Sequence, residues 1–240
     1  MKKSITPLRL LVIIPCYNEA GSLPLLLPEL KRLQLAGYEV TIAVVNDASA
    51  DATVAVARKE GVTVLDLPVN LGIGGAVQTG LKYAYTHGFD LALQLDGDGQ
   101  HPPAEISKLL GCYEDGNPNV VIGSRFLEKR GFQSSFTRRL GIRYFYWLNR
   151  LFTGNAVFDS TSGFRLLDRR AIAKAATYYP DEYPEPESLV FFARSGLVIA
   201  ETPVVMKYRE NGASSIGNFT SVYYMVKVTI SMFFSFIRRH

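Results

Sequence analysis

Four apolar runs without polar alternation lie in the first half of the chain, and each is followed by a polar loop. They are RLLVIIP at 9–15, VTIAVVND at 40–47, VTVLDL at 62–67 and LALQLD at 91–96. Runs rich in Val, Ile and Leu predict strands that are buried on both faces of a sheet. The segments between them have helical spacing, and Gly61 and Gly88 are typical helix ends. Strands that alternate with helices predict an α/β fold with a parallel sheet covered on both faces.

Polar residues cluster where three of these predicted strands end. The clusters are CYNEAGS at 16–22, NDASAD at 46–51 and DGDGQH at 96–101. In sheets of this type ligands bind beyond the carboxyl ends of the strands. We therefore expect the three clusters to converge on one site.

The second half is less regular. VIGSRF at 121–126 predicts a strand that leads into a basic segment, and DSTSGFRLLDRRAIAKAA at 159–176 predicts a loop, a strand and a helix. We expect one domain over 1–217, with a nucleotide and metal half over about 1–124 and an acceptor half over about 125–217. Residues 218–240 are expected to form a separate C-terminal helix.

That C-terminal segment is apolar except for one narrow stripe. The stripe consists of Thr220, Tyr224, Lys227, Ser231, Ser235 and Arg238. A membrane-spanning helix needs about 20 predominantly apolar residues, and Lys227 lies near the middle of this one. The pattern favours an amphipathic helix at a membrane interface or on a membrane partner. A helix packed on the domain itself is the alternative.

Charge is distributed unequally between the two halves. Residues 1–124 carry 9 Lys/Arg and 13 Asp/Glu, whereas residues 125–240 carry 17 and 9. Seven Lys/Arg lie between Arg125 and Arg150, interleaved with aromatic residues. This asymmetry indicates an anionic partner for the second half. A solvated basic face is the alternative, and the absence of a recognition motif argues against nucleic acid.

The cysteines and the N-terminus bear on location. The two cysteines, Cys16 and Cys112, are far apart in the sequence and are expected to be free thiols. The apolar run near the N-terminus is too short for a secretory signal. We expect a cytoplasmic protein.

Asp96 and Asp98 suggest a metal site. The sequence contains no G-x-x-x-x-G-K-[ST] loop and no glycine-rich dinucleotide fingerprint. Phosphates must then be neutralised in another way, and carboxylate and amide oxygens from Asp96, Asp98 and Gln100 suit Mg²⁺ or Mn²⁺. An Asp-rich turn without a metal is the alternative.

Several motifs together resemble a known family. They are VIIPCYNEAGSL, VVNDASADAT, NLGIGGAVQTGL, DGDGQHPP, GSRF and DSTSGFR. In this order they resemble the family 2 inverting glycosyltransferases of the GT-A fold, in the branch of the polyprenyl- and dolichyl-phosphate sugar synthases. The resemblance implies a GT-A α/β fold with a mainly parallel sheet, a hexosyltransferase activity and a divalent cation, Mg²⁺ or Mn²⁺.

The resemblance also implies roles for single residues on the donor side. Nucleoside or nucleotide contacts are implied for Pro15, Tyr17, Glu19, Asp47 and Asp96, and metal contacts for Asp96, Asp98 and Gln100. One departure is Ile73, where relatives often have Lys.

On the acceptor side, the resemblance implies that Arg125 and Arg143 bind the acceptor's phosphate. Arg138 and Arg139 are close enough in sequence to compete with Arg143. Arg209 matches an arginine that closes over the diphosphate.

We therefore predict a metal-dependent transferase that moves a sugar from a nucleotide donor, a UDP-sugar before GDP-mannose, to polyprenyl phosphate at the cytosolic membrane face. A phosphate acceptor is ionised at neutral pH and needs no general base. A small separate membrane protein is a further expected partner. His101 is expected to be structural.

Two alternatives remain. The same fold can transfer to a hydroxyl of a lipid-linked saccharide, with Glu187 as the base or as a residue shaping the acceptor site. The acidic cluster around Glu187 can also simply favour a helix start. A non-catalytic scaffold that binds nucleotide sugars is the other alternative.

Overall fold

The computed structural model describes residues 6–128, 136–154, 156–207 and 220–238. A seven-stranded sheet has the order β3-β2-β1-β4-β6-β5-β7. Its strands are β1 Leu8–Cys16, β2 Tyr38–Asn46, β3 Thr63–Asp66, β4 Leu91–Gln94, β5 Val120–Ser124, β6 Arg165–Asp168 and β7 Ile199–Pro203. β6 runs antiparallel to both of its neighbours, and the other pairs are parallel. The predicted α/β fold with a mainly parallel sheet is confirmed.

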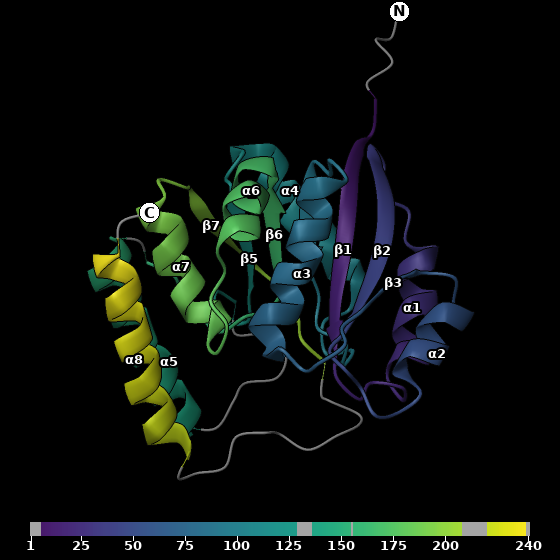
Figure 1. Cartoon of the computed structure of the whole chain (residues 1–240). Coiled ribbons are helices and arrows are strands. Elements are labelled where there is room, and N and C mark those ends of the chain that lie inside the picture. The colour runs from purple at the N-terminus through teal and green to yellow at the C-terminus, as the bar shows by residue number, and fades with distance from the viewer. Residues whose placement is uncertain (1–5, 129–135, 155, 208–219, 239–240) are drawn as a thin grey trace, which may run out of the picture.

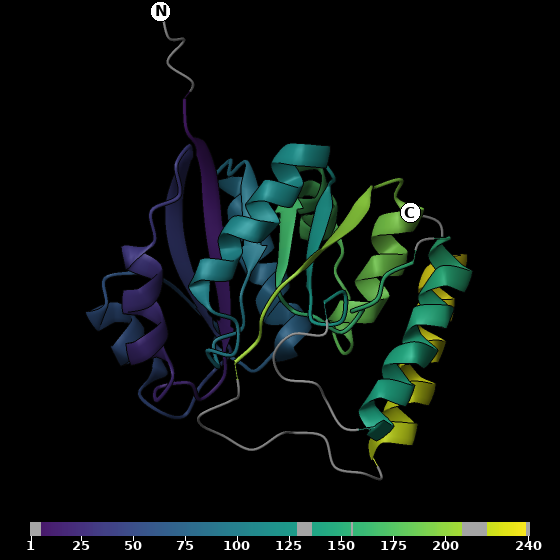
Figure 2. The same cartoon turned by 180° about the vertical axis from the view of Figure 1, so that it is seen from behind.

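Helices cover both faces of this sheet. They are α1 Leu23–Arg32, α2 Thr53–Lys59, α3 Gly72–Thr86, α4 Ile106–Gly116 (after the short 3₁₀ turn Pro103–Glu105), α5 Phe136–Thr153, α6 Arg169–Thr177, α7 Pro184–Arg194 and α8 Thr220–Ile237. Figures 1 and 2 show α3, α6 and α7 on one face and α4 on the other, with α1 beside β1 and β2.

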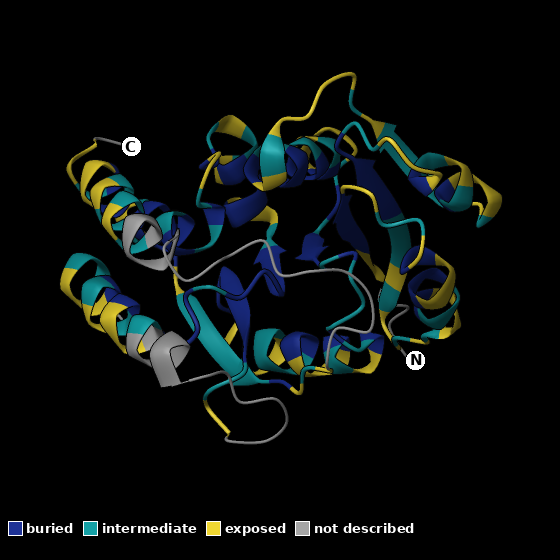
Figure 3. Ribbon diagram, turned by 90° about the horizontal axis from the view of Figure 1, so that it is seen from below, coloured by how far each residue is buried: buried dark blue, intermediate teal, exposed yellow. Residues whose placement is uncertain are grey.

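The core has one layer on each face because the strand residues alternate between the two sides. On β4, Ala92 packs with the residues of α3 and α6, whereas Leu91 and Leu93 pack with those of α1 and α4. Figure 3 shows the buried strand ends in the middle, surrounded by helices that are exposed on their outer sides. The runs that form β1 and β4 thus correspond to strands buried on both faces. The prediction is wrong for β3, which lies at the edge of the sheet and is only partly buried.

The N-terminus of α3 packs directly against the chain before α7. A Cβ added to Gly74 would lie 2.1 Å from the carbonyl oxygen of Pro180 and 2.4 Å from that of Asp181. Only glycine fits such an approach of backbone to backbone. This contact joins the helix that follows β3 to the segment that leads into α7.

α5 and α8 lie beside each other at the edge of the molecule, against α7 (Figures 1 and 2). Their buried sides form a small core with α7 that contains Phe145, Val190, Val228 and Met232. The Tyr144 hydroxyl lies 2.7 Å from Thr229 Oγ1 across the pair. In the part of the chain that the structure describes, no helix is long and apolar enough to cross a bilayer.

Candidate active site

The first two polar loops are cross-linked by hydrogen bonds between side chains and backbone. Ser49 Oγ accepts from the Asn18 N–H at 2.9 Å, and Asn18 Oδ1 accepts from the Ala50 N–H at 2.9 Å. Thr53 Oγ1 accepts from the Glu19 N–H at 2.9 Å. Asn18 has a φ of 58°, a left-handed conformation that asparagine tolerates better than most residues. These bonds hold the loops after β1 and β2 as one unit.

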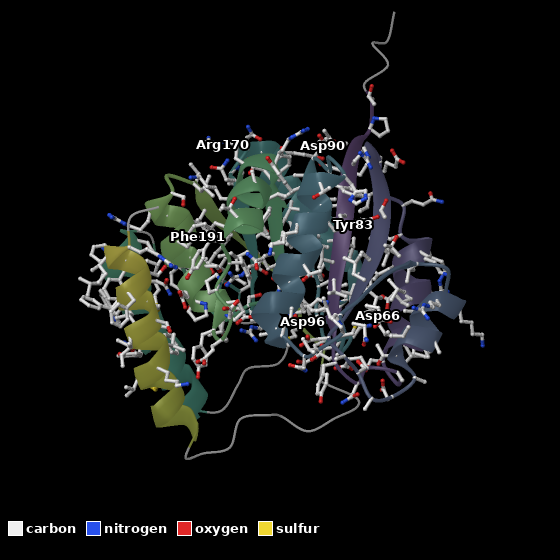
Figure 4. The ribbon with its side chains drawn as sticks, viewed as in Figure 1. Asp66, Tyr83, Asp90, Asp96, Arg170 and Phe191 are labelled. Atoms are coloured by element: carbon white, nitrogen blue, oxygen red, sulfur yellow. The ribbon has the colours of Figure 1, made fainter. Side chains whose placement is uncertain are left out.

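The third polar loop lies against the end of β1. A Cβ added to Gly97 would lie 2.8 Å from Cys16 Sγ and 3.2 Å from the Pro15 carbonyl oxygen. Asp96 and Asp98 flank this glycine, and Figure 4 shows Asp96 at the same edge of the sheet as Asp66, opposite Asp90. The expected convergence of the three clusters is confirmed.

Asp96 lies in an unfavourable environment for its own charge. Burial is the main cause that raises its pKa to about 7, and the negative charges of Asp98 and Glu185 add to the effect. Arg125 and Arg165 act in the opposite direction. Two neighbouring carboxylates that are partly shielded from solvent are stabilised when a cation binds between them.

The residues present fit a divalent cation. The backbone N–H of Gln100 donates to Asp98 Oδ1 at 3.1 Å, which fixes the turn that carries both side chains. A Cβ on Gly163 would lie 2.7 and 2.9 Å from the two carboxylate oxygens of Asp96. Because glycine has no side chain, the Asp96 carboxylate has room at this position. In the described ranges no group of three or more His, Cys, Asp or Glu side chains gathers to hold a metal. The two carboxylates, with the amide oxygen of Gln100, would make an open set that substrate phosphates would complete.

Asp47 connects β2 to the start of α3. Its buried carboxylate accepts from the Leu71 N–H at 2.7 Å, and its carbonyl oxygen accepts from Asn70 Nδ2 at 3.2 Å. Asp47 thus fixes the segment that enters α3 at the sheet edge expected to hold the nucleoside.

The other expected nucleoside residues lie at the end of β1. Pro15 is buried, and Tyr17 is 55% exposed beyond it. Glu19 Oε2 accepts from the Ser22 hydroxyl at 2.8 Å, just before α1. The structure therefore brings these residues to the same edge of the sheet as Asp47.

Arg125 follows β5 directly and is largely buried. Its Nε and Nη2 donate to the two carboxylate oxygens of Asp159 at 2.6 Å each, and Nη2 also donates to Thr161 Oγ1 at 2.9 Å. The Asp159 and Asp96 carboxylates both help to raise the pKa of the guanidinium above its ordinary value, although burial opposes them. Arg125 thus lies within the electrostatic reach of the Asp96 loop.

The other two expected arginines are placed differently. Arg143 is exposed on α5, away from the β-sheet. Arg209 lies outside the residues that the structure describes. The side chains of Arg138 and Arg139 also lie outside the described part of the chain. Lys207 lies beside the Asp96 loop, because its N–H donates to the Gln100 carbonyl oxygen at 2.8 Å.

Glu187 points to α8 and not to the Asp96 loop. Its carboxylate accepts from the Tyr178 hydroxyl at 3.1 Å. It lines a cavity of about 330 Å³ together with Tyr178 and residues near the end of α8, among them Phe234 and Arg238. Burial raises the pKa of Glu187, and the hydrogen bond from Tyr178 and the charge of Arg238 oppose this.

Glu185, two positions earlier, is after Asp98 the second carboxylate whose charge acts on Asp96. Burial raises its pKa, and the charge of Arg165 opposes this. Arg165 is fully buried on β6 and donates to the carbonyl oxygens of Ser162 and Glu185 at 2.7 Å each and to Ser188 Oγ at 2.7 Å. A buried cation with neutral partners thus offsets two nearby carboxylates.

His101 is a buried residue at the end of the metal-binding loop. It stacks on Phe164 with 4.9 Å between ring centroids, and its Nδ1 has no hydrogen-bond partner in the described structure. Burial, followed by the charge of Arg125, lowers its pKa to about 4. The ring is therefore neutral at physiological pH and packs as an aromatic residue.

The sequence analysis missed Glu185, Arg165 and Asp159. Asp159 and Arg165 are buried, and Glu185 is partly buried. The sequence contains some indication of these residues: Asp159 and Arg165 lie in the motif DSTSGFR, and Glu185 lies between prolines in PEPE. Which of two carboxylates faces a site depends on where the helix begins, and the sequence does not specify this.

A solved structure has a similar fold. Glucosyl-3-phosphoglycerate synthase from Mycobacterium tuberculosis, in complex with Mn²⁺, UDP-glucose and phosphoglyceric acid, matches with a TM-score of 0.72. The match covers 95% of this chain and 79% of that one, at 17% identity. The fold is therefore that of the GT-A nucleotide-sugar enzymes.

The sequence comparisons identify the family. The family model "Glycosyl transferase family 2" matches residues 11–175. Polyprenol monophosphomannose synthase of Mycolicibacterium smegmatis is 31% identical over 87% of this chain and 81% of its own length. Undecaprenyl-phosphate mannosyltransferase of Micrococcus luteus is 33% identical over 87% and 88%. The chain belongs to glycosyl transferase family 2 and is a glycosyltransferase.

Proposed function

We propose that the chain transfers a sugar, with inversion, from a nucleoside diphosphate donor to a polyprenyl phosphate at the cytosolic face of a membrane. The main observation in support is Arg125, held almost buried beside the Asp96 loop by a fixed carboxylate. The two relatives named above, one a polyprenol monophosphomannose synthase and one an undecaprenyl-phosphate mannosyltransferase, support a lipid phosphate acceptor.

On the donor side, the loops after β1, β2 and β4 would bind the nucleotide. Asp47 and Tyr17 would contact the nucleoside, and Asp96, Asp98 and Gln100 would hold Mg²⁺ or Mn²⁺. The cation, when bound, neutralises charge on the leaving diphosphate. Arg209 would add a second positive charge there.

On the acceptor side, the phosphate is itself the nucleophile. Its second ionisation near pH ~6 leaves a dianion at neutral pH, so no base is required. Arg125 contributes Nη1, because Nε and Nη2 are already bonded to Asp159. Arg125 would therefore contact the phosphate through one nitrogen and not through the two-nitrogen fork that was expected. Arg143 would supply further positive charge.

The outer side of the α5–α8 pair would bind the membrane. We call it the apolar face: Tyr144, Trp147 and Leu151 on α5, and Val226, Ile230, Phe233 and Ile237 on α8, all exposed. Residues at spacings of three and four share one side of a helix, so each helix contributes one stripe. Lys227, which forms an ion pair with Glu182 at 3.1 Å, lies outside this stripe. Such a face suits a bilayer interface, and a small membrane protein is the other occupant to be tested.

A donor and acceptor assay tests the proposal. Purified protein would be incubated with Mg²⁺ or Mn²⁺, a set of radiolabelled nucleotide sugars and a short-chain polyprenyl phosphate in detergent. We expect label to enter the organic phase with one donor, and a UDP-sugar is the first choice because the structural neighbour binds UDP-glucose. Donor binding without transfer to any lipid would contradict the proposal and favour a scaffold.

Transfer to a saccharide hydroxyl is the second candidate function. It is favoured by Glu185, a partly buried carboxylate that interacts with Asp96 and has a raised pKa. A base predicts that Glu185→Gln or Glu187→Gln lowers the rate by about 10²-fold or more. A phosphate acceptor predicts a much smaller effect of Glu187→Gln, because that side chain faces α8.

A further inference from the structure

Arg125 is held by one carboxylate at three points. Asp159 accepts from the backbone N–H of Arg125 at 3.0 Å, from Nε at 2.6 Å and from Nη2 at 2.6 Å. The Asp159 side chain is fully buried, and that of Arg125 is 11% exposed. A bidentate pair with these distances fixes both the position and the plane of the guanidinium.

Asp159 is in turn held by the sheet. Glu201 on β7 accepts from the Asp159 N–H through Oε1 at 2.8 Å and from the Phe158 N–H through Oε2 at 2.7 Å. Thr161 Oγ1 accepts from Arg125 Nη2 at 2.9 Å. The orientation of Arg125 thus depends on a chain of contacts that begins on a strand.

The remaining nitrogen of the guanidinium, Nη1, is bonded to neither Asp159 nor Thr161 and donates only weakly, to the sulfur of Met206. Nη1 lies 3.9 Å from Met206 Sδ, and the guanidinium carbon lies 5.3 Å from the centre of the Phe126 ring. Met206 precedes Lys207, whose N–H is bonded to the Gln100 carbonyl oxygen. Nη1 is therefore the donor that Asp159 leaves available, next to the chain that runs beside the metal-binding loop.

We propose that Asp159 is a positioning residue for the acceptor: it orients Arg125 so that Nη1 alone is presented to the acceptor phosphate. The acceptor in this inference rests on the proposed function, whereas the orientation of Arg125 does not. If Asp159 only compensated the charge of Arg125, its removal would strengthen the binding of the acceptor phosphate, whereas removal of a positioning residue would weaken it. Without Asp159, the positive charge of Arg125 would no longer be compensated, and a correctly placed guanidinium would then bind phosphate more tightly. A guanidinium that has lost its position would instead bind phosphate more weakly.

Asp159→Asn tests this inference because it nearly preserves the size of the side chain. Two readouts are needed on the full-length protein. The first is modification of Arg125 by p-hydroxyphenylglyoxal, followed by peptide mass spectrometry. The second is the affinity and KM for farnesyl phosphate in detergent, beside those for the nucleotide-sugar donor.

We expect Arg125 to be modified faster in Asp159→Asn than in the wild type. We also expect farnesyl phosphate to bind about tenfold more weakly, with an unchanged KM for the donor. Thr161→Val should also speed the modification of Arg125 and weaken the binding of farnesyl phosphate, each by less than Asp159→Asn does. It replaces Asp159→Asn as the test variant if that one does not fold. Asp168→Asn is the matched control: that carboxylate accepts from the Ala171 N–H at the start of α6 and should lower only stability.

The outcomes are distinguishable. Tighter binding of farnesyl phosphate, or unchanged modification of Arg125 in both variants, would overturn the positioning role. Faster modification with unchanged binding of farnesyl phosphate would keep the orienting role of Asp159 but contradict the proposed lipid phosphate acceptor.

Discussion

The donor side and the acceptor side of this site are built in different ways. The loops after β1 and β2 are joined by short hydrogen bonds between neighbouring polar side chains and backbone, such as Ser49 to Asn18. Around Arg125 the contacts are instead buried charges, and the adjoining α5–α8 pair exposes an apolar face. The first side is held together by contacts within the chain, whereas the second is completed by a lipid surface in the proposed function. Predictions that affect one side and leave the other unchanged test this difference.

Asp98→Asn should have the largest effect. Loss of one carboxylate from the metal-binding loop is expected to lower transfer by about 10²–10³-fold, because charge on the leaving diphosphate is no longer neutralised. Binding of farnesyl phosphate should be retained. An initial-rate assay and calorimetric titration with Mn²⁺ measure the donor side, and titration with farnesyl phosphate measures the acceptor side. Undiminished turnover would rule out a metal role for Asp98.

Gly163→Ala should have the second-largest effect. Its Cβ would overlap the carboxylate of Asp96, at 2.7 and 2.9 Å from the oxygens, so this side chain must move. We expect about tenfold weaker Mn²⁺ binding, comparable to the loss of a contact that orients a ligand. Gly111→Ala, at a position where an added Cβ meets no atom within 4 Å, is the control. Equal Mn²⁺ affinity in both variants would mean that Asp96 does not hold the metal.

The apolar face should give a smaller effect, confined to membranes. Ile230→Ser together with Phe233→Ser removes exposed apolar area without changing the buried side of α8. Vesicle binding is expected to weaken about tenfold, since each buried side chain contributes about 1.5–3 kcal/mol and only part of each is exposed. Transfer to farnesyl phosphate in detergent should be unchanged. If co-sedimentation with anionic vesicles is equal to the wild type, the face does not bind lipid.

Ser49→Ala should have the smallest effect. It removes the hydroxyl that accepts from the Asn18 N–H, which leaves one backbone donor of an exposed loop to water. We expect a loss of about 1 kcal/mol in the free energy of unfolding, measured by urea denaturation. A change in the affinity for farnesyl phosphate would show that the two sides are less independent than described above.

The sequence predicted the donor side better than the acceptor side, for a physical reason. Strands of a parallel sheet all end at one edge, so apolar runs followed by polar loops were enough to bring Asp47 and Asp96 to the same edge. Nothing similar applies to Arg125 and Asp159, which are 34 positions apart and meet across a loop. Glu187 was chosen over Glu185 because the sequence does not say which residue of α7 faces the sheet. Arg143 and Arg209 remain predictions.

The contact between Gly74 and the Pro180–Asp181 backbone restricts how such enzymes can be recombined. A chimera that takes its donor side from one relative and its acceptor side from another creates a new junction at this point. If the incoming helix carries even an alanine in place of Gly74, its methyl group overlaps two carbonyl oxygens. Engineered hybrids should therefore inherit α3 and the chain before α7 from the same parent, with the crossover placed elsewhere.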